Sequence, residues 1–124
     1  MPAYRLSQPA AADILDILVW TAMHFGDSAR RRYQVLITTA LLDIETDPLL
    51  PGSRSRLELG PGIRSFHLEH SRRRAMSPDG IVQRPRHLIL YRFLDPAVIG
   101  IGRILHDAMD IERHLPKQFG DELL

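Results

Sequence analysis

Cysteine is absent from this 124-residue chain, which excludes disulfide bonds and thiolate chemistry. The absence also weakens a structural zinc site, because such sites rely on thiolate ligands. Long apolar runs are missing as well, and none approaches the roughly 20 residues that a membrane-spanning helix needs. The first residues lack the apolar segment of a signal peptide, so we expect a cytoplasmic protein.

Lysine is nearly absent: Lys117 is the only one, so 15 of the 16 basic residues are arginines. The net charge is only +1, so bulk charge does not predict a polyanion binder. Two interpretations of the bias remain open. It reflects either an arginine-rich genome or a surface that pairs guanidinium groups with carboxylates or phosphates. In both cases a lysine acid or base is nearly excluded.

The length fits one domain, which we assign to residues 1–124, and residues 86–93 predict its central strand. Side chains alternate across a strand, so one face can be buried whole while the other is apolar in the middle and cationic at both ends. We expect function on that second, half-covered face. The first face carries His87, Ile89, Tyr91 and Phe93, and the second carries Arg86, Leu88, Leu90 and Arg92.

A first helix is predicted from Ser7, which can cap it, to about Phe25, with Pro9 in its first turn. Trp20 falls outside the expected buried stripe and is either a flank of the core or an exposed anchor for a partner. The expected stripe consists of Ile14, Ile17, Leu18, Thr21 and Phe25.

A second helix is predicted to follow at once, because Gly26 suits a helix end and Asp27 can cap the next helix. The two helices must then form an antiparallel hairpin. Arginines 30–32 lie in the first turn, where the helix dipole disfavours cations, so they either mark a site for an acidic partner or are simply solvated. The buried stripe should be Tyr33, Leu36, Ile37, Ala40, Leu41 and Ile44, ending before Asp47 and Pro48.

The second half of the chain reads as strands joined by loops. We expect a loop with one brief strand at 49–62, a strand at 63–70 with a half-buried, hydrogen-bonded Arg64, and a strand at 98–106. Residues 71–85 predict a long basic loop that either steers an anionic partner or is a solvated connection. A short helix at 107–115 and a frayed tail at 116–124 complete the α+β fold, a helix hairpin packed on a small antiparallel sheet.

Catalytic and metal motifs are scarce. His67 and His70 are three apart in the predicted strand, so they lie on opposite faces and cannot chelate one ion together. We expect no metal and no cofactor. Phosphodiester cleavage by arginines with a proton shuttle is the one scheme that has candidates, although Tyr91 and Arg92 face opposite ways. The candidates are Arg64, Tyr91, Arg92, Arg103 and His106.

From about residue 4 to 115 the chain resembles the ParE branch of the ParE/RelE toxin superfamily. The matching segments are YRLS at 4–7, AADI at 11–14, FG at 25–26, PGIRSF at 61–66, RHLILYR at 86–92 and RILHDAMD at 103–110. The resemblance implies the toxin of a bacterial type II toxin–antitoxin, or plasmid stabilisation, system. Such a toxin inhibits DNA gyrase and is neutralised in a hetero-oligomer by a small ParD-like antitoxin.

Two departures qualify the resemblance. The lysines and the tyrosine after the last strand that RelE endonucleases use are missing, which leaves an endonuclease using Arg64, Arg92 and His106 as the alternative. The loop at 71–85 is longer than the tight hairpin of compact ParE members. A degenerate toxin without a target is a third possibility.

We expect an acidic, amphipathic antitoxin segment to lie across the hairpin and the arginine-edged sheet. We expect neither sequence-specific nucleic acid binding nor membrane binding. The expected antitoxin contacts are Trp20, Arg30, Arg31, Tyr33, Arg64, Tyr91 and Arg92. The expected target contacts are Arg72, Arg73, Arg74, Arg103 and His106.

Overall fold

Five strands form one sheet in the order β1-β5-β4-β3-β2, and a computed structural model describes residues 3–108 of the chain. Apart from a turn at 107–108, the short helix and the tail expected at the C-terminus lie outside the described residues. The strands are β1 (Ala3–Leu6), β2 (Arg54–Ser55), β3 (Arg64–His67), β4 (His87–Asp95) and β5 (Val98–His106). The helices are α1 (Gln8–Phe25), α2 (Asp27–Thr46) and the short 3-10 helix η1 (Leu68–Arg74).

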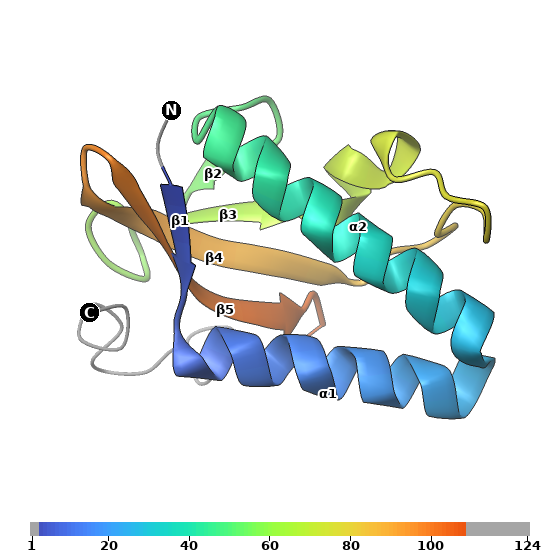
Figure 1. Cartoon of the computed structure of the whole chain (residues 1–124). Coiled ribbons are helices and arrows are strands. Elements are labelled where there is room, and N and C mark those ends of the chain that lie inside the picture. The colour runs from blue at the N-terminus through green and yellow to red at the C-terminus, as the bar shows by residue number, and fades with distance from the viewer. Residues whose placement is uncertain (1–2, 109–124) are drawn as a thin grey trace.

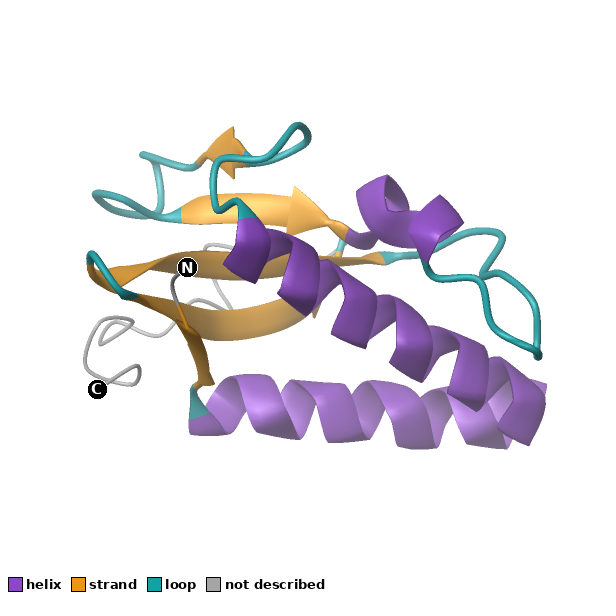
Figure 2. Cartoon of the chain, turned by 45° about the horizontal axis from the view of Figure 1, so that its top comes forward, coloured by secondary structure: helices purple, strands orange, loops and turns teal. Residues whose placement is uncertain are grey.

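The predicted central strand is confirmed, because β4 lies in the middle of the sheet (Figure 1). The sheet is mixed, however, since β1 pairs in parallel with β5 while the other neighbours are antiparallel. Side-chain alternation shows which face is buried but not the direction of a neighbouring strand. Both long helices cover the same face of the sheet, which Figure 2 shows from a second angle.

The start of α1 is fixed by Ser7, as predicted. Its hydroxyl accepts a hydrogen bond from the Ala10 N–H at 3.0 Å and donates one to the carbonyl of Gly102 in β5 at 2.8 Å. The cap therefore starts the helix and attaches it to the sheet. The assignment of Phe25 to the buried stripe was wrong: the ring is 69% exposed and packs edge-on against Trp20. Phe25 is the last helical residue, and its ring lies outside the core.

The stripe of α2 is confirmed, since all six predicted residues are buried. The prediction that Asp27 caps α2 was wrong. Gly26, with a φ of 92°, is the N-cap, and Asp27 is the first helical residue. The Asp27 carboxylate instead pairs with Arg30 at 2.7 Å and with Arg31. That pairing explains how the first turn accommodates arginines against the helix dipole.

The third strand is shorter than predicted. It ends at His67, and residues 68–74 form η1, so His70 does not lie on a strand. The reason is the buried Asp43 carboxylate of α2, which accepts a hydrogen bond from the Ser71 hydroxyl and pairs with the exposed Arg74, both at 2.6 Å. Turning the chain into a 3-10 helix brings these two groups onto α2, which alternation alone does not reveal.

Two clusters fill the two faces of the sheet. The main core packs the helices against the face of Ile89 and Tyr91, and on the other face Leu88, Leu90, Leu105 and Ile63 form a smaller buried cluster. The arginine-edged face is therefore closed at its centre. Neither α1 nor α2, the long helices of residues 3–108, is long and apolar enough to cross a membrane.

A set of polar contacts joins α1 to β5. Because β1 pairs only with residues 98–101, the edge of β5 is open beyond Ile101, where Gly102 forms a bulge opposite β4. The side chain of Asp13, from α1, forms hydrogen bonds with this open edge. Its carboxylate accepts two hydrogen bonds from Arg103, at 2.8 and 3.0 Å, and one from the Ile104 N–H at 2.9 Å.

We expect Asp13→Ala to lower the free energy of unfolding by about 3 kcal/mol, because it removes the carboxylate that accepts hydrogen bonds from the mostly buried Arg103 guanidinium and from the Ile104 N–H. Urea unfolding followed by circular dichroism measures the change. Asp16→Ala, an exposed site on the same helix, is the matched control and should leave the midpoint nearly unchanged. Equal midpoints for the two variants would contradict this role of Asp13.

Candidate functional site

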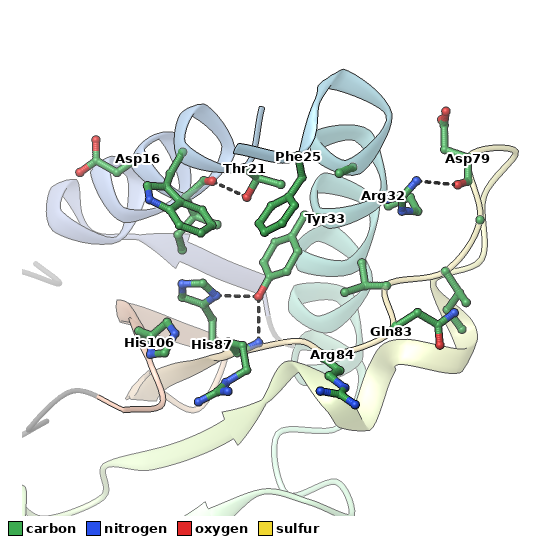
Figure 3. Close-up of a pocket in the computed structure, with 17 residues that line it drawn as sticks. Asp16, Thr21, Phe25, Arg32, Tyr33, Asp79, Gln83, Arg84, His87 and His106 are labelled. Atoms are coloured by element: carbon green, nitrogen blue, oxygen red, sulfur yellow. Dashed lines mark hydrogen bonds between the residues drawn. The ribbon is translucent and has the colours of Figure 1, made fainter. Parts of the chain in front are cut away.

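A groove of about 1070 Å³ lies between the hairpin and the segment that leads into β4. One wall is the C-terminal half of α1, the opposite wall is residues 79–84, and the start of α2 lies between them (Figure 3). Its volume is in the range of sites that hold small molecules or the side chains of a docked peptide. Its lining residues include Ile17, Trp20, Phe25, Arg32, Tyr33, Val82, Arg84, Arg86, His87 and His106.

The mouth of the groove carries two large aromatic rings in contact with water. Trp20 is 52% exposed and stacks on His24 with ring centroids 4.1 Å apart, and Phe25 completes the group. Trp20 is thus exposed, and its role as an anchor for a partner stays a prediction. Exposed aromatic groups beside a cavity are typical of binding surfaces.

The wall formed by residues 79–84 is fixed to α2 by Asp79. Arg31 donates to both carboxylate oxygens of Asp79, at 3.0 and 2.9 Å, and Arg32 donates to its backbone carbonyl at 3.1 Å. The Arg31 hydrogen bonds hold the pKa of Asp79 below its ordinary value. The acidic partner that the first-turn arginines suggested thus includes a residue of the chain itself. The long loop is anchored, and it gives the groove its second side.

The floor of the groove is a buried tyrosine–histidine pair. The Tyr33 hydroxyl accepts from the Arg86 backbone N–H at 3.2 Å and lies 2.6 Å from Nδ1 of His87. Burial raises the pKa of Tyr33 to about 12. Burial, with the nearby His106, lowers the pKa of His87 to about 4. At neutral pH Tyr33 therefore keeps its proton and the His87 ring is neutral, so the hydrogen bond joins two uncharged groups.

A carboxylate network supports this end of the groove. Asp107 accepts from Arg86 at 2.9 and 3.1 Å and from His67 at 2.9 Å. Burial opposes ionisation, but these hydrogen bonds outweigh it and keep the Asp107 pKa below its ordinary value. The ring of His106 lies edge-on to His87 at 5.3 Å. The result is a rigid polar end on an otherwise apolar groove.

The residues expected to bind partners divide into separate places. Trp20, Tyr33 and His106 line the groove, whereas Arg30 and Arg31 lie at the start of α2. At the other end of the sheet, Arg64 donates to the Ser53 hydroxyl at 2.8 Å, as predicted, and Arg92 lies opposite Gly100. Tyr91 is buried, and its hydroxyl is hydrogen-bonded to Ser53 and to the Pro48 carbonyl. Arg72 donates hydrogen bonds to Val82 and Gln83, and Arg73 is exposed. Arg74 forms an ion pair with Asp43, and Arg103 forms one with Asp13.

Sequence reasoning missed Phe25, Val82, Arg84, Arg86 and His87 as members of one site. His87 offered a signal, because it shares a predicted strand face with Tyr91, which the helices cover. The loop residues offered none, since their place depends on the contact between Asp79 and α2. That contact joins positions 48 residues apart.

The order of the elements and the packing of the hairpin on the sheet allow a comparison with known protein families. The model of the family described as "ParE toxin of type II toxin-antitoxin system, parDE" matches residues 4–111. The chain belongs to the ParE toxin family. The match spans almost the same residues as the resemblance seen in the sequence. Comparison with curated proteins gives no match.

The histidine in the floor of this ParE-family groove predicts an acid-sensitive fold. Since the folded pKa of His87 is about 4 and the ordinary value is 6.5, the unfolded chain binds this proton first as pH falls. Stability should therefore decrease between about pH 6.5 and pH 4. Asn in place of His87 keeps an acceptor for Tyr33 but does not titrate. Unfolding midpoints for wild type and His87→Asn should diverge with pH, and parallel curves would contradict the assignment.

Proposed function

We propose that this chain is a toxin that stops growth by binding DNA gyrase and that a ParD-like antitoxin neutralises it by occupying the groove. The family match supports a toxin with an antitoxin partner. The observation that carries the proposal is the groove itself: an apolar cavity, bordered by exposed Trp20 and Phe25, that the described residues leave open. An amphipathic helix with apolar anchors fits such a site.

A binding mode of action is favoured over catalysis by the register of the sheet. The endonuclease alternative requires Arg64, Arg92 and His106 to act together. His106 lies opposite His87, whereas Arg92 lies five residues further along β4, which is about 16 Å at the usual rise of a strand. A phosphodiester group could not contact all of these side chains in one productive geometry.

The target is tested with purified proteins. We expect the toxin to inhibit DNA supercoiling by gyrase on a relaxed plasmid and to leave the mRNA in a reconstituted translation reaction intact. Toxin premixed with a ParD-like antitoxin that neutralises it should have no effect on either. Cleaved mRNA with normal supercoiling would replace the gyrase proposal by the endonuclease alternative, and no effect in either assay would indicate a degenerate toxin.

The groove is tested with Trp20→Ala. Loss of a central aromatic anchor should weaken antitoxin binding by about 2 kcal/mol, or roughly thirtyfold, measured by titration calorimetry. Met23→Ala is the matched control, since Met23 is 76% exposed on the same helix and does not line the groove.

Co-expression distinguishes the two partners in cells. If the antitoxin occupies the groove and gyrase binds elsewhere, cells with the Trp20→Ala toxin stop growing even when the antitoxin is present, whereas Met23→Ala is still neutralised. Equal neutralisation of both variants would show that the antitoxin does not bind in the groove. Loss of toxicity in Trp20→Ala alone would assign the groove to the target.

A further inference from the structure

The outer face of α1 carries a row of apolar side chains that remain in contact with water. Leu15, Val19 and Met23 are 63%, 50% and 76% exposed. Because they are four residues apart, they lie one above another on a single face of the helix, which we call the α1 stripe. The opposite face carries the buried Ala10 and Thr21 and packs on the rest of the protein.

The α1 stripe is separate from the groove. None of its three residues lines the cavity, so a helix held in the groove does not by itself cover the stripe. Single exposed apolar residues are ordinary on a protein surface, but a contiguous row of them indicates an interface. Figure 1 shows α1 along one border of the molecule, with both α2 and the sheet on its other side, so a second molecule can approach the stripe.

The polar residues beside the stripe indicate what that second molecule is. Asp16 and His24 are the exposed polar residues within positions 14–25. Each lies four residues from Trp20, in opposite directions along the helix, so the three share one flank of the stripe. If an identical helix packs antiparallel with the two Trp20 positions facing each other, Asp16 of each copy lies opposite His24 of the other. A parallel pair would instead place two Asp16 carboxylates together, which is repulsive.

The ring of His24 is oriented for such a contact. Its Nδ1 donates a hydrogen bond to the Trp20 carbonyl at 2.8 Å, and the ring stacks on the Trp20 indole. Nε2 is therefore the nitrogen left for a partner, and a carboxylate that faces it pairs with the protonated ring. The same antiparallel arrangement brings Val19 to the centre of the contact and Leu15 against Met23 of the second copy. Charge and apolar surface are thus matched in one register.

We propose that the free chain forms a symmetric dimer through an antiparallel pair of α1 helices, centred on Val19, in which Asp16 of each copy pairs with His24 of the other. Symmetric contacts of this kind use the same patch on both copies. One helix face is a small interface, so the dimer is weak and reversible. This inference goes beyond the proposed function and does not depend on the antitoxin or on gyrase.

The dimer is tested on the full chain by sedimentation velocity over a dilution series. We expect a monomer–dimer equilibrium, accompanied by a red shift of Trp20 fluorescence on dilution, because Trp20 flanks the contact and is the only tryptophan. Val19→Glu, which places two carboxylates at the centre, should weaken association by at least about tenfold. Leu57→Glu, at a site that is 74% exposed and outside α1, is the matched control. A wild-type chain that is monomeric throughout, or equal association of the two variants, would overturn the proposal.

Charge reversal tests the register. Asp16→Lys or His24→Glu alone should weaken association by about threefold, because each puts like charges opposite one another. The double variant restores opposite charges and should associate nearly as well as wild type. In a parallel pair the double variant would have like charges at both positions. Absence of rescue would therefore overturn the antiparallel pairing, and circular dichroism verifies that each variant is folded.

The alternative occupant of the stripe is the antitoxin. Methyl resonances of Val19 that are insensitive to dilution of the free chain, but shift when the antitoxin is added, would assign the stripe to the antitoxin and overturn the dimer. Methyl shifts of Val19 on dilution alone would support it. Met23→Ala should weaken pairing while leaving the groove lining intact, so the antitoxin should still neutralise this variant. Failure of the dimer thus leaves the assignment of the groove unchanged.

Discussion

The contact of Asp13 with Arg103 and the Ile104 N–H is the constraint on which the architecture depends. Strand β1 covers only part of the β5 edge, and without Asp13 the rest of that edge would face the helix layer with unsatisfied polar groups. By filling the edge, the carboxylate fixes the distance and the angle between α1 and the sheet. Since α2 follows α1 after one glycine, the same contact sets the position of the whole hairpin. The groove is the space that this placement leaves between the hairpin and the loop before β4.

Arginine has two different roles in this chain. One set is internal: Arg31 holds the loop through Asp79, Arg74 reaches the buried Asp43, and Arg86 is fixed by Asp107. These pairs use the planar guanidinium group to connect elements that are distant in sequence. The other set, which includes Arg73 and Arg84, is exposed and has its charge directed to solvent.

Local patterns predicted most of the fold, and long-range pairing explains the rest. The stripe of α2, the Ser7 cap and the central position of β4 follow from periodicity and helix capping, which depend on neighbouring residues. The parallel direction of β1, the 3-10 turn of η1 and the anchored loop depend on partners far along the chain. Asp43 with Ser71 and Arg31 with Asp79 are such pairs. The candidate site was predicted only in part for the same reason: Trp20 and Tyr33 were named from their helices, whereas the loop wall has no local signature.

The strand order has a consequence for the synthesis of the toxin. The first strand can pair only with the last one, and Ser7 bonds to Gly102 across 95 positions. A nascent chain therefore cannot complete its sheet or attach its hairpin until β5 has left the ribosome. Fragments released early lack the edge that receives α1 and hence the shaped surface between the layers. The groove between the layers therefore forms only once β5 has been synthesised.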